Sequence, residues 1–141
     1  MTEWEIPLLL DTCAAIWLAN ADPIAEPASD ALDSAYAAGL DTYVSPITAW
    51  ELGMLVARGR LSLRFRPETW FERLLAVPSV HLSKMSTDIL IRSSFLPGTP
   101  PKDPADRIIA ATARELGYRL MTRDRVLLAY AGEGHIQAIG C

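Results

Sequence analysis

The sequence has few cysteines and no long apolar run. Its two cysteines, Cys13 and Cys141, lie at opposite ends of the 141 residues, outside any CxxC pair and outside metal-ligand spacing of His81 or His135. This pattern gives neither a disulfide framework nor a zinc motif, so a reduced, cytoplasmic setting is expected. The N-terminus lacks the basic residues of a signal peptide, and its run IPLLL is far shorter than the ~20 residues of a membrane span. We therefore expect no membrane association.

Positive charge is also scarce. Lysine and arginine total 13 against 17 acidic residues, a formal net charge of -4. Because nucleic-acid-binding domains are usually basic overall, any nucleic acid would have to bind to a local basic patch on this protein. The run RGRLSLRFR, which begins at Arg58, is one candidate, although a charge run is more often a solvated face. With 50% hydrophobic residues and no repeat or linker, we expect one globular domain spanning residues 1–141.

Short apolar segments alternate with helical ones along the chain. We expect strands at residues 6–11, 42–45, 79–83, 119–122 and 136–140, and helices at residues 12–20, 27–38, 46–58, 67–76, 85–95, 104–116 and from about 125. This alternation predicts an α/β fold with a parallel sheet that is covered by helices on both faces. In such open sheets, ligands bind at the carboxyl ends of the strands.

Several acids stand where strands end and helices begin. Asp11 closes the first strand and Asp124 follows the strand RLMT, so both should project from the same edge of the sheet. Asp103 and Asp106 crowd the first turn of the helix that begins at Pro104. Each acid also has a structural explanation: Asp103, Asp11 and Asp124 can cap helices, and Asp106 favours the helix dipole. The sequence alone leaves both roles open.

Glu51 lies within an apolar helical pattern. In SPITAWELGMLVARG, the residues Ile47, Trp50, Met54 and Leu55 have the spacing of one helical face, and Glu51 falls on it. A carboxylate on a buried face requires a partner, a cation or a wet cavity. A slightly rotated helix would instead turn Glu51 toward solvent.

Three or four acids that converge on one sheet edge repel one another, and either a bound divalent cation or raised pKa values relieve that repulsion. A cation held by carboxylate oxygens and waters is typical of Mg²⁺ or Mn²⁺ sites, and such an ion activates water and neutralises a phosphodiester. Other residues have simpler interpretations. Cys13 is expected to be a small core residue, and Trp17, Trp50 and Trp70 to be core or interface residues.

Four motifs in this order carry a family resemblance. The segments LLLDT, SPITAWELG, DPADRIIAATARELG and MTRDRVL, which span most of the chain, resemble the PIN domain, especially VapC-type toxins. The resemblance implies a three-layer α/β/α sandwich and a metal-dependent endoribonuclease that uses Mg²⁺ or Mn²⁺, acts on RNA, forms a homodimer and is silenced by a cognate antitoxin. It assigns the catalytic and metal-binding roles to Asp11, Glu51, Asp106 and Asp124, with Thr122 as a supporting hydroxyl. Asp103 matches a neighbouring acid whose role is open.

Two alternatives come from other protein classes. A haloacid-dehalogenase-type phosphatase also has an Asp after its first strand, but it expects a second acid two residues later, where this sequence has Cys13. A non-catalytic interaction module would instead pair the acids with Arg107, Arg123 and Arg125. Metal-dependent cleavage of RNA, or its absence, separates these interpretations.

Overall fold

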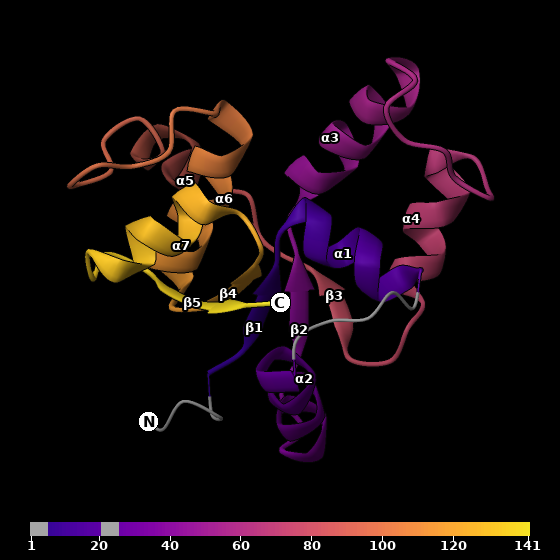
Figure 1. Ribbon diagram of the computed structural model, residues 1–141, viewed down its shortest axis with the longest axis horizontal. Coiled ribbons are helices and arrows are strands. Elements are labelled where there is room, and N and C mark those ends of the chain that lie inside the picture. Colours follow the sequence, from indigo (N-terminus) through magenta and orange to yellow (C-terminus); the bar gives the residue numbers. More distant parts are fainter. Residues whose placement is uncertain (1–5, 21–25) are drawn as a thin grey trace.

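The chain forms one parallel sheet with helices packed on both faces (Figure 1). The computed structural model describes residues 6–20 and 26–141, and within them the sheet has five strands in the order β3-β2-β1-β4-β5. All pairings are parallel, with Leu9 opposite Tyr43 of β2 and Leu120 of β4. The strands, each inside its predicted range, are β1 Leu8–Leu10, β2 Thr42–Val44, β3 Val80–Leu82, β4 Arg119–Thr122 and β5 Gln137–Gly140.

The helices follow the predicted segments closely. They are α1 Thr12–Ala19, α2 Glu26–Ala37, α3 Pro46–Ala57, α4 Pro67–Leu75, α5 Thr87–Arg92, α6 Pro104–Leu116 and α7 Arg125–Gly132. The prediction for α5, residues 85–95, was too long. Ser86 caps this helix by accepting a hydrogen bond from the Ile89 N–H, and tight turns bonded to Ile91 and Arg92 carbonyls end it. A capping serine therefore sets the helix start two residues later than the apolar pattern indicated.

Two hydrophobic cores lie on opposite faces of the sheet. Leu8 and Leu10 pack on one side, in a core that includes residues of α1, α2 and α4, whereas Leu9 packs on the other side with residues of α6 and α7. The alternation of side chains along β1 explains this division, and burial on both faces explains why the strand is apolar throughout. The predicted three-layer α/β/α sandwich is confirmed.

The chain order of the strands reverses direction beside β1. Its neighbour on one side is β2, which follows it in the chain, and on the other side is β4. Such a switch point opens a crevice at the carboxyl ends of the adjoining strands, where ligands bind. Asp11 follows β1 directly and Thr122 ends β4, so these two residues lie at the switch point. No helix in residues 6–20 and 26–141 is long and apolar enough to cross a membrane.

Candidate active site

Asp11 is buried at the switch point and is held at both carboxylate oxygens. Oδ1 accepts a hydrogen bond of 2.7 Å from the Ala14 N–H, which makes Asp11 the N-cap of α1, and Oδ2 accepts one of 2.5 Å from the Thr122 hydroxyl. Only 4% of Asp11 is exposed. Burial raises the pKa of Asp11 above its usual range, although the two hydrogen bonds act in the opposite direction. Asp11 can therefore cap α1 and also contribute to a site at this edge of the sheet, so its two predicted roles are compatible.

Thr122 also connects Asp11 to Asp124. Its Oγ1 accepts a hydrogen bond of 2.9 Å from the Asp124 N–H. The Asp124 carboxylate caps α7, because its Oδ1 accepts from the Val126 and Leu127 N–H groups at 2.8 and 3.0 Å. A single buried hydroxyl thus fixes the ends of β1 and β4 and the start of α7 relative to one another.

Glu51 approaches the same edge from α3. Its Oε1 accepts a hydrogen bond of 2.5 Å from the Thr12 hydroxyl, which lies 3.1 Å from the Thr48 hydroxyl. Burial raises the pKa of Glu51, Thr12 lowers it, and Asp103 and Asp11 raise it further. Neither Thr12 nor Thr48 was singled out from the sequence. The position of Thr12 directly after Asp11 was the available signal.

The predicted apolar face of α3 is confirmed in part: Ile47 and Leu55 pack against the cores and Glu51 is half-buried, but Trp50 does not lie on that face. The buried residues of this helix are Thr48 and Leu52, and Trp50 is 57% exposed. The helix turns a mixed polar and apolar line, spaced i and i+4, toward the protein. Its large apolar Trp50 points to solvent, so Trp50 is a surface residue, whereas Trp70 is buried as predicted.

Asp103 and Asp106 complete the group of acids. Asp103 caps α6 through a hydrogen bond of 3.0 Å from the Asp106 N–H, as predicted. One ligand oxygen from each of Glu51, Asp103 and Asp106 lies within 4.8 Å of the others. Burial raises the pKa of Asp106 to about 7, with further contributions from the charges of Asp103, Asp124, Glu51 and Asp11. The structure therefore places Glu51 and Asp106 in one cluster with Asp103, whereas Asp11 and Asp124 lie outside that cluster but near enough for their charges to act on Asp106.

Cys13 lies beside this group and is exposed, contrary to its expected place in the core. It follows Thr12 on the first turn of α1, where the buried positions are occupied by Thr12, Ala14 and Ala15. Partial burial of the thiol, followed by the charges of the nearby acids, raises the pKa of Cys13 to about 11.

Arg107 and Arg123 both donate hydrogen bonds to backbone oxygens. Arg107, which follows Asp106, donates to the carbonyls of Ser93 and Pro101 at 2.8 and 3.0 Å. Arg123 donates to the Cys141 carbonyl, and its guanidinium lies 3.7 Å from the centroid of the Trp17 ring. A paired arginine would lower the pKa of a carboxylate, whereas Asp11, Glu51 and Asp106 all have raised values. The raised pKa values of these three acids are not those expected of carboxylates paired with arginine.

Comparison with known proteins places this arrangement in a family. A model of the PIN domain matches residues 8–133. The chain belongs to the PIN-domain family. This PIN domain is also 33% identical over 125 residues to Ribonuclease VapC22 from Mycobacterium tuberculosis. The aligned residues cover 87% of this chain and 91% of the relative. The resemblance to VapC-type chains predicted from the sequence is thereby confirmed, and the dehalogenase-type alternative is set aside.

Solved structures share the fold of this PIN domain. VapBC2 from Rickettsia felis, bound to a DNA fragment from its promoter, aligns with a TM-score of 0.65 and 14% identity over 96% of this chain and 98% of that one. FitAB bound to the IR36 DNA fragment gives a TM-score of 0.55 and 21% identity over 94% of each chain. FitAcB from Neisseria gonorrhoeae aligns with a TM-score of 0.51 and 23% sequence identity, over 94% of this chain and 96% of that one. At these identities, the likeness shows the fold.

Proposed function

We propose that this PIN domain is an endoribonuclease that hydrolyses RNA phosphodiester bonds with Mg²⁺ or Mn²⁺, and that it is the toxin of a toxin–antitoxin pair that inhibits translation or growth in the cytoplasm. The cluster formed by Glu51, Asp103 and Asp106, on which the charges of Asp11 and Asp124 also act, supports this function most directly. Membership of the PIN family and 33% identity to a protein named as a ribonuclease support it further.

The residues at the site fit a hard divalent cation. Carboxylate oxygens are the ligands that Mg²⁺ and Mn²⁺ prefer, and burial together with the charges of neighbouring acids raises the pKa values of Glu51 and Asp106. Asp11, Glu51, Asp106 and Asp124 would hold the ion, directly or through waters, and Asp103 is near enough to Glu51 and Asp106 to take part. A bound ion of this kind neutralises a phosphodiester and lowers the pKa of water.

The protein's own groups orient these ligands. Thr122 holds Oδ2 of Asp11, and Thr12 holds Oε1 of Glu51. Hydrogen bonds of this type fix the orientation of a ligand carboxylate, and because each carboxylate oxygen has two lone pairs, it can still bind a cation. Because Asp11, Asp103 and Asp124 also cap helices, their carboxylates are attached to rigid elements, which favours accurate positioning.

The decisive experiment is cleavage of a mixed RNA pool by the purified protein. Excess EDTA should abolish cleavage, Mg²⁺ or Mn²⁺ should restore it, and Asp11→Asn should be inactive under all conditions. Asp41→Asn is the matched control, because Asp41 is a half-buried acid that lies 3.1 Å from His81 on the β2–β3 side. Robust cleavage in excess chelator would reject the metal-dependent mechanism.

We also infer a homodimer and a cognate antitoxin. The related VapBC2 and FitAB structures are complexes bound to DNA, which supports an antitoxin partner. The exposed apolar side chains of Trp50, Ile91 and Phe95, at 57%, 60% and 80%, support a protein interface on α3 and near α5. A strict monomer at micromolar concentration, together with toxicity that no neighbouring small gene relieves, would contradict both inferences.

A further inference from the structure

The segment from Ser93 to Lys102 joins α5 to α6 and leads directly into Asp103 and Asp106. It contains Pro97 and two further prolines, which have no N–H for backbone hydrogen bonds, and it forms no regular element. The position of the first turn of α6 therefore depends on contacts that this segment makes with the rest of the protein.

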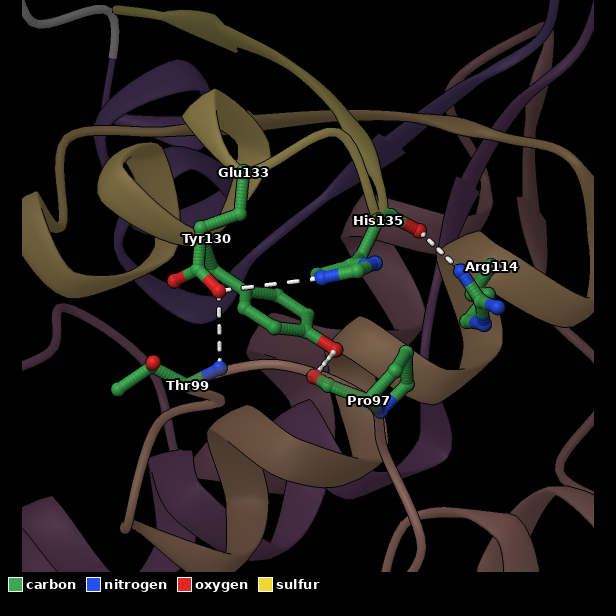
Figure 2. Close-up of polar contacts among 6 residues, drawn as sticks. All are labelled: Pro97, Thr99, Arg114, Tyr130, Glu133 and His135. Carbon is green, nitrogen blue, oxygen red and sulfur yellow. Dashed lines mark hydrogen bonds and ion pairs between the residues drawn. The ribbon is translucent and has the colours of Figure 1, made fainter.

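Two residues at the end of α7 supply such contacts (Figure 2). The hydroxyl of Tyr130, a fully buried residue, donates a hydrogen bond of 2.6 Å to the Pro97 carbonyl. Oε1 of Glu133 accepts one of 2.9 Å from the Thr99 N–H. These two hydrogen bonds hold the segment in place on either side of Gly98.

Gly98 makes this close approach possible. Its φ of +69° is in the left-handed region, and a Cβ at this position would collide with the Glu133 carboxylate and the His135 ring. His135 Nε2 lies 3.8 Å from Glu133 Oε1, and the His135 carbonyl accepts a hydrogen bond of 2.8 Å from Arg114 of α6. The end of α7, the segment and α6 are thus joined at one place, as Figure 2 shows.

The two ends of α7 perform different tasks. Its first turn is capped by Asp124, at the site, and its last turn carries Tyr130 and Glu133. Glu51, Asp103 and Asp106, whose oxygens lie within 4.8 Å of one another, repel when no cation is bound. This repulsion would push the start of α6 away from Glu51. The hydrogen bonds from Tyr130 to Pro97 and from Thr99 to Glu133 would oppose that displacement.

We propose that Tyr130 and Glu133 are positioning residues, which hold residues 97–99 and thereby place Asp103 and Asp106 beside Asp124 for cation binding. This role rests on the proposed function. Tyr130 and Glu133 lie at the opposite end of α7 from Asp124, and neither was among the residues predicted for the site.

The test is Mn²⁺ affinity of the full chain, measured by electron paramagnetic resonance of the free ion in the absence of RNA. Glu133→Ala and Tyr130→Phe should each weaken binding, and the double variant should weaken it by about 10-fold or more, the effect usual for residues that orient metal ligands. Glu133→Gln keeps an oxygen that accepts from the Thr99 N–H, so its affinity should remain near that of the parent. Glu72→Ala, an exposed site on α4 with the same loss of charge, is the matched control.

Hydrogen exchange of the Thr99 amide provides a second readout and should accelerate in Glu133→Ala but not in Glu72→Ala. Glu133 is partly exposed, with 34% of its side chain accessible, so Glu133→Ala keeps the test usable if Tyr130→Phe fails to fold. Parental Mn²⁺ affinity in Glu133→Ala, or equal weakening in Glu133→Ala and Glu133→Gln, would overturn the positioning role alone. A parent that binds no Mn²⁺ would overturn the proposed metal site and this role with it, whereas Mn²⁺ binding without RNA cleavage would overturn only the nuclease activity.

Discussion

The Thr122 hydroxyl donates to Oδ2 of Asp11 across 2.5 Å, and this bond joins the carboxyl ends of β4 and β1 inside the protein. The same oxygen of Thr122 accepts from the Asp124 N–H. One hydroxyl therefore serves as both donor and acceptor at the centre of the acidic group. Its removal should affect the fold and the site together.

The variant Thr122→Val removes this hydroxyl while nearly preserving the shape of the side chain. We expect a loss of about 1–3 kcal/mol in the free energy of unfolding, because Asp11 and the Asp124 N–H each lose a partner in a buried place. Thr122→Ser should retain most of the stability and most of the RNA cleavage. Urea denaturation of the parent, Thr122→Val and Thr122→Ser measures the free energy of unfolding of each protein. A valine variant as stable as the parent would show that the hydroxyl contributes little to stability.

Asp106 should make the metal-free protein less stable as pH rises. Its pKa is about 7 in the folded protein and about 4 in the unfolded chain, so between these values the folded state keeps a proton that the unfolded state has released. The stability that this proton contributes is present below about pH 4 and is lost as pH rises through about 7. Because Asp106 is partly exposed, we expect an effect on the order of 1 kcal/mol.

The check on Asp106 is a comparison of thermal melts in EDTA at pH 5 and pH 7.5. Asp106→Asn carries no titrating group at this position, so it should lose less stability over that interval than the parent does. At pH 7.5 it should be at least as stable as the parent. An identical pH dependence in the two proteins would show that Asp106 does not retain its proton.

Divalent ions should stabilise the parent and have much less effect on Asp11→Asn. A ligand of the native state at 100 times its Kd contributes about 2.7 kcal/mol. Without metal, the asparagine variant should be about as stable as the parent or more stable by on the order of 1 kcal/mol, because one of several repelling charges is removed. Melts in EDTA and in Mg²⁺ test both statements. A loss of about 3–5 kcal/mol in EDTA, without a Mg²⁺ effect on the parent, would favour the interaction module, in which Asp11 balances a buried arginine.

The sequence predicted the sheet and the positions of Asp11 and Asp103 at element boundaries because these features depend on local signals. The apolar run before Asp11 and the capping pattern around Asp103 each encode the start of an element, and parallel strands end at one edge. The exposure of Trp50 was not predictable from its spacing, because the face that α3 buries is determined by packing against elements distant in sequence. Nor does any local motif relate Glu133 to Thr99, which are 34 positions apart.

Cys13 should react slowly with alkylating reagents although it is exposed. Partial burial and the nearby acids raise its pKa to about 11, compared with a usual value of 9.0, so the thiolate fraction at pH 8 falls by about 100-fold. Because a thiolate of higher pKa is intrinsically more nucleophilic, the net rate should fall by about 10-fold relative to a small-molecule thiol.

Iodoacetamide labelling at pH 8, followed by peptide mass spectrometry in EDTA, measures the rate at Cys13. Asp106→Asn should accelerate the labelling, because it removes one of the charges that oppose thiolate formation. The buried Cys141 in the same samples reports any general loosening of the fold. Faster labelling of Cys13 with unchanged labelling of Cys141 would link the thiol to the acids electrostatically. Labelling of Cys13 at the rate of a free thiol in the parent would contradict the electrostatic description of the whole acidic group.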